Sequence, residues 1–278
     1  MKQTSDHKTA SLRDVDYWLA EWLKSDRRES QNTQEAYRRD VGQFLHSSGK
    51  PFDAVSIGDF AEFQASLFEY KARTRARKMA AVRSFYRYLA KREVVTVNLD
   101  KLETPKIQQR IDRDKLLTEA EIQSMIQAAA SDAHRVYVRF LYLTAVRVSE
   151  SLSLRWRDIT PLGDGSATAH IIGKGNKYRD VFLPAKLHID LKLYCYSGDQ
   201  NALVFAPIKN RVQALRIVQG LAKAAKVDKK VSPHSFRHCH LSHALKNGAT
   251  LAELRDQAGH ASISTTSLYL HGTGEQAT

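Results

Sequence analysis

Hydrophobic residues in the first hundred positions recur at the spacing of an amphipathic helix. In residues 73–92 they form one stripe, which consists of Met79, Val82, Tyr86 and Leu89. The same period recurs in three earlier segments, and together they predict an all-helical domain over residues 1–107. The four expected helices cover residues 11–25, 32–48, 56–70 and 73–92.

The pattern changes after the fourth helix. Residues 94–115 are polar, contain Pro105 and show no sustained period, which indicates a linker between two domains. Beyond this stretch, Thr118 and Glu121 have the spacing of a capping box, in which each side chain bonds the backbone N–H of the other residue. A helix is therefore expected to begin after Thr118.

Residues 108–278 mix helical periods with one alternating segment. In residues 166–184, apolar and polar positions alternate on both sides of a Gly-Lys-Gly-Asn turn, which predicts two short antiparallel strands. The second domain is therefore expected to be mainly helical with a small antiparallel sheet. Its later helices are expected over residues 133–146, 149–154, 184–194, 211–225, 233–247, 250–257 and 262–270.

The charge balance points to an anionic partner. Lysine and arginine number 43 against 30 acidic residues, so the formal net charge is +13. Such a chain is attracted to polyanions, because each neutralised phosphate releases counterions. Nucleic acid is the leading candidate, an anionic membrane surface is the alternative, and solubility alone would also explain the charge.

Cysteine usage and hydropathy favour a cytoplasmic protein. Cys195 and Cys239 form no CxxC motif or disulfide-like framework and are expected to be reduced thiols. The first residues are polar and lack the apolar centre of a signal peptide, and no run has the length of a transmembrane helix. We therefore expect no membrane association.

The fourth predicted helix has a basic face opposite its apolar stripe. No acidic residue interrupts positions 71 to 92. An ordinary solvated face usually mixes both signs of charge, so we favour contact with a DNA backbone or groove over that simpler interpretation. The basic residues of this face are Arg73, Arg77, Arg83, Arg87 and Lys91.

The second domain contains an ordered set of basic, histidine and tyrosine residues. Each fragment alone is weak evidence, because a Gly-Lys-Gly turn or a tyrosine near a C-terminus is common. The order and spacing of the whole set are far more specific. The members are Arg147 in R-V-S-E, Lys174 in G-K-G-N-K, His234 and Arg237 in H-x-x-R, His260 in G-H, and Tyr269.

This set resembles the tyrosine recombinase family, also called the phage integrase family, and Xer-type recombinases look most similar. The resemblance covers nearly the whole chain: the first domain resembles the SAM-like core-binding domain, and the second resembles the catalytic domain. It implies a site-specific DNA recombinase that exchanges strands through a Holliday junction. The catalytic roles then fall on Arg147, Lys174, His234, Arg237, His260 and Tyr269.

These residue types suit phosphoryl transfer without a metal or another cofactor. Arg147 and Arg237 would bind the non-bridging phosphate oxygens, as metal ions do in other enzymes. Tyr269 would attack the phosphorus and form a 3′-phosphotyrosyl link. His234 is a candidate base, and Lys174 can protonate the departing 5′-oxygen. His260 would hydrogen-bond the phosphate.

Two further features have competing interpretations. Glu150 lies three residues after Arg147, so it either orients that arginine or is an ordinary surface carboxylate. The histidine-rich segment HSFRHCHLSH suggests zinc, but its residues point to different sides of one helix and have no closed-site spacing. We therefore expect no metal site.

Three departures from the family pattern stand out. Thr144-Ala145-Val146-Arg147 replaces the frequent T-G-L-R, and Ala258 stands where a larger apolar residue is usual. Only nine residues follow Tyr269, among them two glycines, whereas a longer C-terminal helix docks on the neighbouring subunit in Xer-like relatives. How subunits couple is thus left open.

The expected partner is double-stranded DNA with a specific recombination site, bound by a homotetramer on synapsed DNA, with a partner recombinase or accessory protein left open. Rival functions are a non-catalytic DNA-binding regulator, a metal-dependent nuclease, and a topoisomerase with the same tyrosine chemistry. The target site and the biological role do not follow from the sequence.

Overall fold

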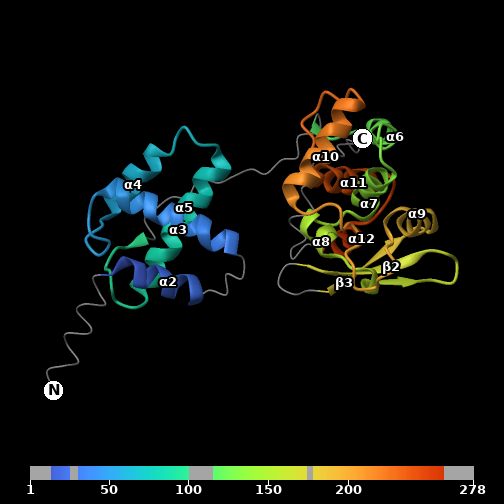
Figure 1. The fold of residues 1–278 in the computed structure, drawn as a ribbon. Coiled ribbons are helices and arrows are strands. Elements are labelled where there is room, and N and C mark those ends of the chain that lie inside the picture. The colour runs from blue at the N-terminus through green and yellow to red at the C-terminus, as the bar shows by residue number, and fades with distance from the viewer. Residues whose placement is uncertain (1–13, 26–30, 100–114, 174–177, 260–278) are drawn as a thin grey trace, which may run out of the picture. The chain divides into compact units, whose positions relative to one another are not determined.

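The computed structural model describes residues 14–25, 31–99, 115–173 and 178–259 (Figure 1). The chain divides into two compact units, Met1–Gln108 and Gln109–Thr278, and each has a hydrophobic core of its own. No helix in the described ranges is both long enough and apolar enough to span a bilayer.

The first unit is helical, as the spacing of its apolar residues predicts. The four residues of the stripe in the fourth helix are all fully buried. Phe44 contacts Phe60 with ring centroids 4.8 Å apart, and Trp22 contacts Phe85 with centroids 5.3 Å apart. The helices are α2 (Val15–Ser25), α3 (Gln31–Ser48), α4 (Ile57–Ser66) and α5 (Ala72–Ala90).

The expected linker begins later than the sequence indicates. Val95 and Leu99 are buried in the core of the first unit, each with 7 % exposure. The prediction that the linker starts at residue 94 is therefore wrong, because the apolar residues at positions 94–99 attach this stretch to the core, against which Val94 and Val97 also pack. Residues 100–114 lie outside the described residues.

The second unit is mainly helical with one small antiparallel sheet, which confirms the expected fold class. Thr118 caps the first of its helices with the predicted capping box. The helix expected over residues 262–270 lies outside the described residues. The helices are α6 (Glu119–Gln127), α7 (Asp132–Thr144), α8 (Val148–Ser153), α9 (Ala185–Cys195), α10 (Arg211–Ala224), α11 (Pro233–Lys246) and α12 (Leu251–Ala258), with a 3-10 turn at Trp156–Asp158.

The sheet has three strands in the order β1-β2-β3, one more than the two predicted. They are β1 (Ile159–Pro161), β2 (Ala167–Ile172) and β3 (Tyr178–Leu183). Ala169 pairs with Ile159 on one side and with Val181 on the other. The face that carries these residues is buried, so the sheet covers one side of the core.

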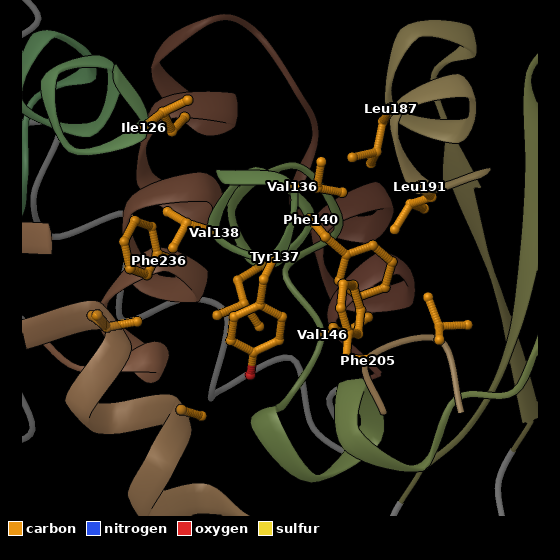
Figure 2. Close-up of a cluster of buried hydrophobic side chains, with 14 of the residues drawn as sticks. Ile126, Val136, Tyr137, Val138, Phe140, Val146, Leu187, Leu191, Phe205 and Phe236 are labelled. Atoms are coloured by element: carbon orange, nitrogen blue, oxygen red, sulfur yellow. The ribbon is translucent and has the colours of Figure 1, made fainter. Parts of the chain in front are cut away.

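Helix α7 lies at the centre of this core and packs against both α11 and α9 (Figures 1 and 2). Tyr137 and Phe140 of α7 contact Phe205, with ring centroids 4.8 and 5.0 Å apart. Phe236 of α11 is fully buried in the same cluster. This packing fixes α7, α8, α11 and β3, which carry the side chains of the candidate site, and α12 packs on α11 through a separate cluster of Leu241, Leu254 and Ala258.

Candidate active site

Arg147 lies at the junction of α7 and α8. Helix α7 ends because Ala145 adopts the left-handed conformation, with φ 51° and ψ 22°. Arg147 then precedes the first residue of α8, and its backbone N–H donates to Oε2 of Glu150 at 2.8 Å. The carboxylate thus closes the first turn of α8 and stands directly beside the arginine.

The Arg147 side chain is held from two sides. Its Nη1 donates to Oε1 of Glu150 at 2.8 Å, and its Nη2 donates to the carbonyl of Gly259 at 3.2 Å. The side chain of Arg147 remains 34 % exposed, whereas that of Glu150 is only 4 % exposed. Of the two interpretations of Glu150, the structure supports the orienting one, since a surface carboxylate would be exposed.

Glu150 is charged in the folded protein. Burial alone would raise the pKa of its carboxyl group. Hydrogen bonds from the Arg179 guanidinium and from the backbone N–H of Arg147 outweigh that effect and hold the pKa below its usual value. The site therefore contains a buried negative charge between two arginines.

Arg237 is a buried cation on α11, with 2 % exposure. Its Nη1 donates to the carbonyl of Ala145 and its Nη2 to the carbonyl of Ala258, both at 2.6 Å. These bonds fix the plane of the guanidinium. They also attach α11 to the end of α7 and to the end of α12.

The C-terminal end of α12 brings three arginines together. The carbonyls of three consecutive residues, 257 to 259, accept hydrogen bonds from Arg179 at 3.0 Å, Arg237 at 2.6 Å and Arg147 at 3.2 Å. The last carbonyls of a helix have no partner within the helix and carry the negative end of its dipole, which suits guanidinium groups. Gly259 ends the helix with a φ of 60°.

The arrangement gathers positive charge at one point. Arg147 and Arg179 both donate to the carboxylate of Glu150, and the guanidinium of Arg237 lies at the same helix end, bonded to two backbone carbonyls. Guanidiniums that are partly or fully buried favour an anionic ligand. A phosphate group suits such a site, because two of its oxygens can accept hydrogen bonds from one planar guanidinium.

The other predicted catalytic residues are only partly placed. His234 is exposed in the first turn of α11, one turn before Arg237, and its ring lies edge-on against His238 with centroids 4.3 Å apart. Lys174, His260 and Tyr269 lie outside the described residues. The structure therefore brings Arg147 and Arg237 to the end of α12, and the roles of all six residues stay predictions.

The histidine-rich helix distributes its side chains among separate partners. His240 contacts Oε1 of Gln257 at 3.1 Å, and His243 contacts the Tyr142 hydroxyl at 2.9 Å. Burial is the main cause that lowers the pKa of both histidines. Among the residues with described positions, no group of three or more His, Cys, Asp or Glu side chains could hold a metal ion.

The basic face of α5 is less uniform than its sequence suggests. Arg77 forms an ion pair with Asp40 of α3, and Nη2 of Arg83 donates to the carbonyl of Leu99 at 3.3 Å. Arg73, Arg87 and Lys91 are exposed. An acidic residue from a neighbouring helix thus partly neutralises a face that no acid interrupts within α5 itself.

Arg179 of β3 belongs to the site but is not among the residues predicted from the sequence. A signal for it exists, because Val181 and Leu183 alternate on the buried face of β3 and Arg179 occupies the same face. A charged residue at such a position requires a buried partner. That partner is Glu150, which contacts Nη2 of Arg179 through Oε2 at 2.7 Å.

Comparisons with known proteins cover both units. The phage integrase family model matches residues 115–276, and the model of the phage integrase N-terminal SAM-like domain matches residues 15–93. A tyrosine recombinase of Thermosipho africanus is 30 % identical over 267 residues, covering 91 % of this chain and 93 % of that protein. The tyrosine recombinase XerC of Anoxybacillus flavithermus is also 30 % identical, covering 91 % of each chain.

A solved structure shows the same fold. The XerH site-specific recombinase, in a post-cleavage complex with its palindromic difH substrate, aligns with a TM-score of 0.70. The match covers 91 % of this chain and 80 % of the XerH chain, at 19 % sequence identity.

Proposed function

The chain belongs to the phage integrase family, the tyrosine recombinases of Xer type, and on this basis we propose that it recombines double-stranded DNA at a specific site. The observation that carries the proposal is the group of arginines at the end of α12. Arg147 and Arg237, 90 positions apart in the chain, are both held there by backbone carbonyls. Their charge would stabilise a phosphodiester as negative charge grows on its oxygens.

The chemical step follows from the residue types. Tyr269 attacks the phosphorus, its phenol proton passes to a base such as His234, and a 3′-phosphotyrosyl bond forms. The bond to the 5′-oxygen breaks, and Lys174 supplies the proton that this leaving group needs. His260 donates a hydrogen bond to the phosphate. The new bond keeps the energy of the old one, so a second 5′-hydroxyl can reverse the step without ATP.

The wider assignment follows the family. Residues 1–107 act as the DNA-binding core domain through the exposed cations of α5, and residues 108–278 act as the catalytic domain. A homotetramer assembles on two synapsed sites in the cytoplasm and resolves a Holliday junction. Neither a metal ion nor another cofactor takes part.

The test is a covalent trap. The protein is incubated in EDTA with a supercoiled library of genomic fragments, and the reaction is stopped with SDS. The DNA that remains attached to the protein is then sequenced. We expect attachment by the wild type and by Tyr194→Phe, a control at an exposed tyrosine of α9. Tyr269→Phe should bind DNA but form no attachment.

Other outcomes identify the rival functions. Attachment that persists in Tyr269→Phe contradicts the proposed nucleophile. Binding without attachment by the wild type indicates a non-catalytic DNA-binding regulator, and cleavage that requires added metal indicates a nuclease. Relaxation of the supercoiled plasmids without exchange of fragments indicates a topoisomerase.

A further inference from the structure

Arg179 on β3 is the third arginine of the site and has no role in the chemistry described above. We propose that Arg179 is a positioning residue, which holds Glu150 and the end of α12 so that Arg147 faces the scissile phosphate. The proposal rests on the proposed function, because it assigns to Arg147 the role of binding that phosphate.

Arg179 supplies the main support of Glu150. Nη2 of Arg179 donates to Oε2 of the carboxylate at 2.7 Å and Nη1 donates to Oε1 at 3.2 Å, so the two groups form an end-on bidentate pair. The side chain of Arg179 is nearly buried and that of Glu150 is buried, with 10 % and 4 % exposure. A bidentate arginine partner holds a buried carboxylate in one orientation. Because Oε1 of Glu150 also accepts a hydrogen bond from Nη1 of Arg147, the position of Glu150 fixes that of the Arg147 guanidinium.

Arg179 also fixes the second partner of Arg147. Its Nε donates to the carbonyl of Gln257 at 3.0 Å, in the last turn of α12. A Cβ atom at position 259 would lie only 3.1 Å from Cδ and from Nη1 of Arg179, so the helix end closes directly on this side chain. The carbonyl of Gly259 is the acceptor for Nη2 of Arg147.

These contacts indicate that Arg179 acts through Arg147 and does not itself touch the substrate. Each nitrogen of the Arg179 guanidinium bonds either Glu150 or Gln257, and the side chain is nearly buried. Arg147, by contrast, is 34 % exposed and can meet a ligand. Lysine at position 179 would keep the charge but lose the paired geometry, since an ammonium group cannot bind a carboxylate in the bidentate way.

The experiment compares cleavage of two nicked duplexes that carry a site recovered by the covalent trap. One has the normal phosphodiester at the cleavage position, and the other has a methylphosphonate, which bears no negative charge. Release of the 5′-hydroxyl strand is measured under single-turnover conditions. The variants are Arg179→Lys and a matched control, Arg139→Lys, which replaces an arginine paired with Asp190 at 2.5 Å elsewhere in the same unit.

We expect Arg179→Lys to bind DNA as the wild type does and to cleave the phosphodiester about 10- to 100-fold more slowly, because small misplacements of a catalytic group have effects of this size. On the methylphosphonate the difference from the wild type should shrink strongly, since this group carries one negative charge fewer for Arg147 to neutralise. Arg139→Lys should match the wild type on both duplexes.

Three results would overturn the inference. The first is an equal loss of cleavage rate by Arg179→Lys on both duplexes, which would indicate general damage to the fold. The second is cleavage by Arg179→Lys at the wild-type rate, and the third is a loss of cleavage rate in Arg139→Lys equal to that in Arg179→Lys. If Arg179→Lys does not fold, Glu150→Gln replaces it in the experiment. The same loss of cleavage rate on the phosphodiester, and the same smaller loss on the methylphosphonate, are then expected, and the same results would contradict the inference. Failure of the wild type to attach to any DNA would instead refute the proposed function.

Discussion

Arg237 and Ala145 are joined by a hydrogen bond of 2.6 Å, from the guanidinium Nη1 to the backbone carbonyl, across 92 positions of the chain. The bond exists because Ala145 leaves the helical conformation at the end of α7 and turns its carbonyl toward α11. Any residue at position 145 can supply the carbonyl, but few tolerate the positive φ of 51°.

Glycine should be tolerated at position 145 better than at an ordinary buried alanine. Ala145→Gly loses a methyl group and adds freedom to the unfolded chain, but relief of the left-handed backbone offsets about 1–2 kcal/mol. Ala222 of α10 is also buried, but in a right-handed helix, and is the control. Calorimetry should show Ala145→Gly to be more stable than Ala222→Gly by at least about 1 kcal/mol. Equal losses would contradict the role given to backbone strain.

Position 259 should be sensitive for a reason beyond its backbone. Gly259→Ala places a methyl group against Arg179, whereas Gly248→Ala, also at a positive φ (95°), meets nothing within 4 Å. Both variants should lose about 1–2 kcal/mol of stability in thermal unfolding, because alanine is strained there. Only Gly259→Ala should also slow covalent attachment to DNA, by about 10-fold, as Arg147 loses its support. A similar attachment rate in the two variants would contradict this expectation.

The first unit should be sensitive to acid through Asp59. Lys50 is the main cause that lowers the pKa of this carboxyl from 3.8 to about 2, and Ser56 adds to the effect. Because the folded pKa lies below the unfolded one, the stabilisation is complete above pH 3.8 and disappears as the pH falls toward 2.

Asp59→Asn should remove this acid-sensitive contribution. At pH 7 we expect a loss of about 1–2 kcal/mol in the unfolding of the first unit, since the variant loses a charged hydrogen bond and part of a helix cap. Its stability should change less than that of the wild type between pH 4 and pH 2. Asp53→Asn, at an exposed position nearby, is the control and should retain the wild-type pH profile.

Arg87 should contribute to DNA binding as a single phosphate contact. The residue is exposed on α5, so Arg87→Gln should lower affinity and reduce the slope of log K against log salt by about 0.9. Lys24→Gln is the control in the same unit, because Lys24 forms an ion pair with Glu21 on α2 at 3.2 Å. An unchanged slope in Arg87→Gln, or an equal change in both variants, would contradict a DNA-binding role for this face of α5.

Periodicity and capping were sufficient to predict most of the helices, because both depend on residues within four positions of each other. The stripe of α5 is buried as expected, and Thr118 begins α6 with the predicted capping box. The third strand escaped prediction, because β1 has only three residues and no alternation of its own to recognise. The early part of the linker was misassigned because burial of Val95 depends on the whole first core.

Local patterns in the sequence are enough to predict the helical segments, the positive charge and the ordered set of residues that carries the family resemblance. The three-dimensional packing is needed to show that Glu150 is a buried partner of Arg147, that Arg179 also binds Glu150, and that the carbonyls at the end of α12 hold three arginines. These contacts join residues 145–150, 179, 237 and 257–259, which lie too far apart in the chain for local propensities to relate them. Their geometry arises because α7, α11 and β3 share one core, while α12 packs on α11 through a smaller cluster of Leu241, Leu254 and Ala258 and also contacts β3.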